Sequence, residues 1–97
     1  MINISEGEME IVMGILNAYV PKDKVLCFGS RIANNYRKYS DLDIVIKSKE
    51  EIPLSKLSEL EEAFQEADLP FRVDVVDWNR ISDEFKKIIE KSYKVLK

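Results

Sequence analysis

Three aspartates and a glycine turn are the residues of this chain whose types and spacing could do chemistry. Asp41 and Asp43 lie two residues apart in a segment that reads as a strand. A strand sends alternate side chains to opposite faces, so this spacing places both carboxylates on one face. Asp74 lies in another apolar segment and supplies a third carboxylate. Like charges aimed at one point favour a cation between them, so the pattern predicts a divalent metal site.

The types of side chain available as donors limit which metal ion and which substrate the site can bind. The chain has no histidine and a single cysteine, Cys27, so a metal must be held by oxygen, which favours Mg²⁺ or Mn²⁺. Magnesium uses few protein carboxylates and completes its shell with water and phosphate oxygens. We therefore predict a two-metal site in which Asp41, Asp43 and Asp74 are the metal ligands and catalytic residues, with a nucleoside triphosphate as the donor. Asp74 could also accept the proton of an attacking hydroxyl.

A glycine turn follows the first predicted strand and is expected to bind phosphate. Gly29 lets the backbone approach a phosphate without an intervening side chain, and Ser30 adds a hydroxyl and an N–H. If a helix begins just after Ser30, its N–H groups favour an anion. Arg31 could balance phosphate charge. The sequence thus assigns Gly29, Ser30 and Arg31 to nucleotide binding.

The helices and strands around these residues are predicted from hydrophobic periodicity and from capping residues and prolines. A capping box at Ser5 and Glu8 begins a helix that Pro21 closes. The other expected elements are a strand at 25–28, a short helix and loop at 32–39, a strand at 42–46, a helix at 54–67, a strand at 71–76, and a final helix capped by Ser82 or Asp83 with Phe85, Ile88, Ile89, Tyr93 and Leu96 on its inner face.

This order predicts an α/β (α+β) fold, with a mixed three-stranded sheet and helices packed on it. The glycine turn ends the first strand, whereas the acidic pair begins the second. Both can build one site only if those two strands run antiparallel.

Length and charge set further expectations. The 97 residues fit a single domain spanning 1–97, and the net charge of −3 argues against nucleic-acid or membrane binding through bulk positive charge. No signal peptide or membrane-length apolar run is present, so we expect a cytoplasmic protein. Cys27 lies between Leu26 and Phe28 and is expected to be a buried structural thiol.

Each feature alone has a simpler explanation. A Gly-Ser pair is usually only a turn, an Asp-x-Asp is usually a solvated strand end, and Asp74 could be paired by Arg72. Asp77-Trp78 is interpreted as a strand-end turn, and Tyr36 and Tyr39 as loop packing. The three chemical features together, at strand ends and in this order, favour a site.

At this point the chain resembles a known family. Phe28-Gly-Ser-Arg31, ten residues before the aspartate pair in Ser40-Asp-Leu-Asp-Ile-Val45, resembles the signature of the DNA polymerase β-like nucleotidyltransferase superfamily. The short chain and the segment Val73–Trp78 resemble its minimal members, the MNT proteins. The resemblance implies a polymerase β palm-like fold and the same roles for Asp41, Asp43, Asp74, Gly29 and Ser30. Many relatives carry a glycine shortly after Gly-Ser-Arg, where Asn34 is expected to substitute.

The resemblance also implies a partner and an acceptor. Minimal members commonly act with a helical HEPN protein as antitoxin and toxin, and transfer AMP to a tyrosine of that toxin, which implies ATP as the nucleotide donor. Two alternatives stay open: transfer to a small molecule such as an antibiotic, and a binding-only antitoxin that neutralises its partner by contact. A domain this small is expected to work as a homodimer or with a helical partner.

Overall fold

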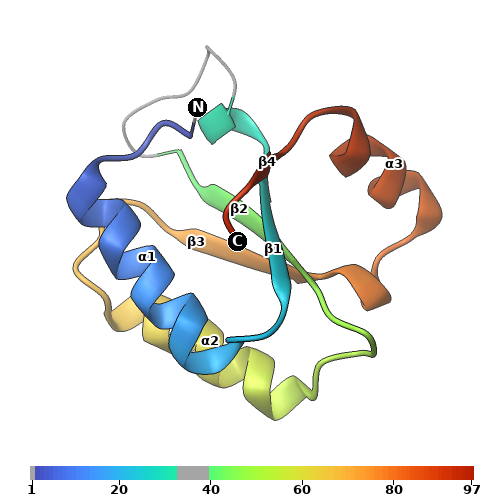
Figure 1. Cartoon of the computed structure of the whole chain (residues 1–97), viewed down its shortest axis with the longest axis horizontal. Coiled ribbons are helices and arrows are strands. Elements are labelled where there is room, and N and C mark those ends of the chain that lie inside the picture. Colours follow the sequence, from blue (N-terminus) through green and yellow to red (C-terminus); the bar gives the residue numbers. More distant parts are fainter. Residues whose placement is uncertain (1, 33–39) are drawn as a thin grey trace.

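The structure is a computed structural model that describes residues 2–32 and 40–97 (Figure 1). The expected short helix and loop at 32–39, the proposed role of Asn34 and the packing of Tyr36 and Tyr39 therefore lie almost wholly outside the described residues. The elements, in chain order, are α1 (Glu6–Tyr19), β1 (Lys24–Phe28), the 3-10 turn η1 (Ser30–Ile32), β2 (Leu42–Lys47), α2 (Leu54–Glu66), β3 (Val73–Asp77), the 3-10 turn η2 (Trp78–Arg80), α3 (Asp83–Lys91) and β4 (Lys94–Val95).

The sheet has the strand order β3-β2-β1-β4, so β2 and β1 are its central strands. β1 and β2 are antiparallel, as the position of the glycine turn and the aspartate pair predicted. β3 runs parallel to β2, which brings the beginnings of these two strands to the same edge of the sheet. The mixed α/β architecture predicted from the sequence is confirmed.

The last part of the chain corrects the prediction of a three-stranded sheet and a longer final helix. α3 ends at Lys91, and the next residues form a short fourth strand, β4, antiparallel to β1. The edge of β1 needs hydrogen-bond partners, and the C-terminal segment supplies them: Leu96 donates its N–H to the Val25 carbonyl at 2.9 Å, and Val25 donates to the Lys97 carbonyl at 2.9 Å. Tyr93 consequently lies outside the helix and is exposed.

Two apolar layers cover the two faces of the sheet. On one face, α1 and α2 lie side by side and pack on alternate strand residues such as Cys27, Ile44 and Ile46 (Figure 1). On the other face, α3 packs through Ile89 against Leu26, Phe28 and Val45. The strand residues therefore divide by alternation into an α1/α2 face and an α3 face.

Local sequence explains where the helices begin. The predicted capping box is present: the Ser5 hydroxyl accepts from the Glu8 N–H at 3.1 Å, and the Glu8 carboxylate accepts from the Ser5 N–H at 2.8 Å. Ser82 caps α3 by accepting from the Phe85 N–H at 3.1 Å. Among the described residues, none of the helices has the length and apolar character needed to cross a membrane.

The two adjacent isoleucines of α3 give a matched test of this packing. Ile89 is fully buried, whereas Ile88, which the sequence also placed on the inner face, is 59% exposed. We expect Ile89→Ala to lower the free energy of unfolding by about 2–5 kcal/mol and Ile88→Ala by under about 1 kcal/mol. Urea denaturation of both variants measures the difference. Equal losses would contradict the orientation of α3.

Candidate active site

The predicted carboxylates meet at one edge of the sheet. Asp43 is the second residue of β2 and Asp74 the second residue of β3, and the two are register partners. On the other side, Asp43 is the register partner of Phe28, which Gly29 follows. Register partners in a sheet point to the same face, so Asp43 and Asp74 share a face, as predicted. The end of β1 and the beginnings of β2 and β3 therefore bound one site.

This site lies on the α3 face. Asp43 alternates with Leu42 and Ile44, which are buried on the α1/α2 face. Asp41 precedes β2, and its carboxylate forms an ion pair with Arg72, Oδ2 to Nη2, at 3.2 Å. The Arg72 side chain is 70% exposed and the Asp41 side chain 42%, so this pair orients Asp41 more than it stabilises the fold. The sequence suggested Arg72 as a partner for Asp74, but the structure pairs it with Asp41.

The electrostatics show that the three carboxylates act on one another. Burial, together with the negative charges of Asp74 and Asp41, raises the pKa of Asp43 from its ordinary 3.8 to about 6. Arg72 opposes the rise with a smaller effect. A carboxylate with this pKa has a strong preference for a nearby cation or a proton.

Gly29 is required at its position by two separate constraints. Its φ is +83°, a left-handed backbone conformation that side chains disfavour. A Cβ atom added there would also collide with the Oδ2 atom of Asp43. The glycine thus lets the turn lie directly against the Asp43 carboxylate, which is the close approach that the sequence predicted.

Ser30 and Arg31 follow in η1. The Ile32 N–H donates to the Gly29 carbonyl at 3.3 Å, and Ser30–Ile32 form a 3-10 turn at the end of this described segment. Arg31 is 4% exposed, and its guanidinium donates to the carbonyls of Ser40 at 3.0 Å and Asn3 at 2.9 Å. It also lies 4.4 Å from the centre of the Phe71 ring.

These contacts give Arg31 a positioning role that the sequence did not reveal. It ties the N-terminal segment to Ser40, the residue directly before Asp41. The phosphate-binding role predicted for Arg31, like that for Ser30, stays a prediction. The sequence signal at Arg31, an arginine directly after a Gly-Ser turn, is typical of a phosphate ligand and does not indicate the positioning role.

The three carboxylates suit a divalent cation that is bound mainly through the phosphate oxygens of a nucleotide. Within residues 2–32 and 40–97, no group of three or more carboxylate or thiol side chains already has the geometry to hold a metal ion. Magnesium usually takes one or two protein carboxylates and completes its shell with water and phosphate oxygens. An all-oxygen donor set with the raised pKa of Asp43 fits that use, so Asp41, Asp43 and Asp74 are the residues that would hold it.

Two other titratable residues, Asp77 at the far end of β3 and Cys27 in β1, are structural. Asp77 is buried and accepts from the N–H groups of Ile52 at 2.8 Å and Asn79 at 3.0 Å, and it pairs with Arg80 at 3.2 Å. This confirms the strand-end turn interpreted at Asp77-Trp78. Cys27 is also structural, as expected: it is fully buried, and burial raises the pKa of its thiol to about 12.

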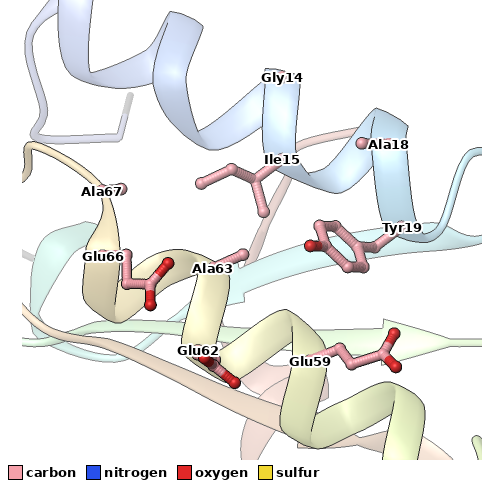
Figure 2. Close-up of a pocket in the computed structure, with 9 residues that line it drawn as sticks. All are labelled: Gly14, Ile15, Ala18, Tyr19, Glu59, Glu62, Ala63, Glu66 and Ala67. Atoms are coloured by element: carbon pink, nitrogen blue, oxygen red, sulfur yellow. The ribbon is translucent and has the colours of Figure 1, made fainter.

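A groove elsewhere on the molecule holds none of the site residues. It lies between α1 and α2, has a volume of about 550 Å³ and contains Tyr19 and Ile15 (Figure 2). Its rim carries Glu59, Glu62 and Glu66. Because α1 and α2 cover the opposite face of the sheet, the groove is separate from the carboxylate site.

The raised pKa of Asp43 predicts how its replacement affects stability. A group whose pKa is higher in the folded state destabilises the fold when it ionises, so Asp43→Asn should stabilise the protein above pH 6. The gain should shrink as pH falls through 6 and vanish below about 4. After solvent screening we expect roughly 1–2 kcal/mol at pH 8 without metal.

Urea denaturation with a chelator present, at pH 8 and pH 5, measures this gain. Asp68→Asn is the matched control, because Asp68 is exposed in the turn before β3. A gain in Asp43→Asn that does not change with pH would contradict the electrostatic explanation.

Comparison with known proteins places the chain in a family. Residues 11–97 match the family described as polymerase beta, nucleotidyltransferase. The chain is 44% identical over 95 residues to the probable protein adenylyltransferase MntA of Haemophilus influenzae, which covers 98% of this chain and 83% of that protein.

Solved structures share the fold. A toxin–antitoxin crystal structure with AMP-PNP matches with a TM-score of 0.78 at 23% identity, over 92% of this chain and 72% of the other. The complex of a tri-AMPylated Shewanella oneidensis HEPN toxin with an MNT antitoxin matches with a TM-score of 0.71 at 22% identity, over 97% and 72%. On the strength of the family match and of the close relative, this chain belongs to the polymerase beta nucleotidyltransferase family and is a nucleotidyltransferase.

Proposed function

We propose that this protein is an antitoxin that transfers AMP from ATP to a tyrosine hydroxyl of a HEPN partner. The observation that carries the proposal is the 44% identity to a probable protein adenylyltransferase over nearly the whole chain. The geometry of the site supports it, because Asp43 and Asp74 are register partners on one face beside the glycine turn.

The site residues have separate roles in the proposed reaction. The tyrosine oxygen attacks the α-phosphorus of ATP, the bond to the β-phosphate oxygen breaks, and pyrophosphate leaves. Asp74 is exposed at the β3 side of the site, where it can accept the tyrosine proton. Asp41 and Asp43 bind and orient the metal–nucleotide complex, and the Gly29 turn makes room for phosphate. Bound magnesium would neutralise charge on the triphosphate.

The exposure of the carboxylates favours a protein acceptor over a small molecule. Asp74 is exposed and Asp43 is half-buried, on the face of the sheet that α3 covers only partly. Small-molecule sites are usually enclosed cavities of about 300–1,000 Å³. A protein that brings its own hydroxyl to an open face does not need such an enclosure. The structural relative from Shewanella oneidensis, in which the toxin is AMPylated, has the same fold.

Mass spectrometry of the partner tests the proposal. A HEPN-type partner protein, incubated with this protein, ATP and Mg²⁺, should gain the mass of AMP on tyrosine. Asp43→Asn should slow transfer by on the order of 10²-fold or more, because one electrostatic element of the site is lost. Asp68→Asn should transfer AMP at the wild-type rate.

Two other outcomes would each favour one of the alternative functions. A partner that wild-type protein leaves unmodified, but that the Asp41→Asn/Asp43→Asn variant still neutralises, would favour a binding-only antitoxin. Transfer to a small hydroxyl compound with the partner left unmodified would favour the small-molecule alternative.

A further inference from the structure

β3 is an edge strand, and its outer side borders the candidate site. β2 pairs with β3 on one side, and the strand order β3-β2-β1-β4 places no strand of the described chain on the other. An unpaired edge presents a row of backbone N–H and C=O groups that can pair with another extended chain. β3 also carries Asp74, the residue proposed to accept the proton of the attacking hydroxyl. A chain that pairs with this edge therefore lies directly beside Asp74.

The register of β2 and β3 shows which backbone groups of β3 point outward. The Leu42 N–H donates to the Arg72 carbonyl at 2.8 Å, and Leu42 is the register partner of Val73. In a parallel pair with this register, the backbone groups of Asp74 point toward β2, and those of Val73 and Val75 point away from it. Among the described residues, no hydrogen bond takes up the outward groups of Val73 and Val75.

The neighbouring helix α2 leaves space beside this edge. A cavity of about 170 Å³ between α2 and β3 is lined by Glu61, Gln65 and residues 72–75. Both α2 side chains are exposed, so α2 does not close off the edge. An extended chain can therefore approach the outward N–H and C=O groups of Val73 and Val75.

A strand added to this edge would place one of its side chains beside the carboxylates. The side chains of paired strands alternate in step, so the residue beside Asp74 projects to the α3 face. It extends the row formed by Asp43 and Asp74, at a strand spacing of about 4.8 Å that a long side chain can cross. Its two neighbours project to the α1/α2 face, beside Glu61 and Gln65. One residue of the added strand is thus presented to the site.

We propose that the protein acceptor binds as an extended segment that adds to the outer edge of β3, with its tyrosine beside Asp74. This inference rests on the proposed function and names how that acceptor is held. Backbone hydrogen bonds to Val73 and Val75 fix the segment, and strand alternation directs the tyrosine hydroxyl to Asp74. Recognition through backbone groups needs no enclosed pocket, which agrees with the exposure of Asp74.

Amide hydrogen exchange, measured residue by residue by NMR, tests this arrangement directly. In the free protein, the N–H groups of Val73 and Val75 should exchange faster than that of Asp74, which points toward β2. A HEPN-type partner protein, added without nucleotide, should slow exchange at Val73 and Val75 by about tenfold or more. The Asp74 N–H should change less, because it is already bonded within the sheet.

A proline at position 75 changes the outer edge selectively. Val75→Pro removes an outward N–H without removing a hydrogen bond between β2 and β3. Val75→Ala is the matched control, because it also loses the half-buried valine side chain but keeps the N–H. We expect Val75→Pro to weaken partner binding by about tenfold or more, and Val75→Ala to bind within about twofold of wild type. Affinity for Mg·ATP, measured by calorimetry without the partner, should match wild type in both variants.

Several results would overturn the docking edge. A partner that does not bind, or that binds and leaves exchange at Val73 and Val75 unchanged, would exclude it. A folded Val75→Pro variant that binds as Val75→Ala does would also exclude it, and if Val75→Pro does not fold, the exchange measurement decides. Protection of both amides in a wild-type dimer, with no further change on adding partner, would assign the edge to a second copy. Protection by the partner without AMP transfer would support the edge and count against the proposed function.

Discussion

The site depends on a carboxylate placed at the start of a buried central strand. β2 has a neighbour on both sides, and its residues Leu42, Ile44 and Ile46 are fully buried. Asp43 lies in this strand and takes a raised pKa from burial and from Asp74 and Asp41. Under the proposed function, a bound cation would offset this unfavourable charge. Gly29 follows from the same constraint, since no side chain fits against the Asp43 carboxylate.

The two faces of the sheet differ in function: one carries most of the apolar core, and the other carries the carboxylate site. α1 and α2 form the larger apolar core and carry many glutamates on their outer side. α3 covers the other face only partly, which leaves the carboxylates accessible from solvent. An open face suits the proposed reaction, in which a nucleotide and a protein acceptor meet at one place.

Much of this arrangement was predictable from the sequence, because strand alternation and the glycine turn act locally. The spacing of Asp41 and Asp43 predicted a shared face, and the position of Gly29 predicted antiparallel strands. Local patterns did not reveal β4, because a two-residue strand forms only when β1 offers an unpaired edge. They also could not separate Ile88 from Ile89, or assign Arg72 to Asp41, because these depend on how distant elements pack.

The most direct test of the central claim, that Asp41, Asp43 and Asp74 form one charge cluster, is an NMR titration of the Asp43 carboxyl carbon. Without metal, the pKa of Asp43 should be about 6 in the wild-type protein. In Asp74→Asn it should fall toward its ordinary value, because one neighbouring negative charge is gone. An Asp43 pKa near 3.8 in the wild-type protein, or one that Asp74→Asn leaves unchanged, would contradict the account.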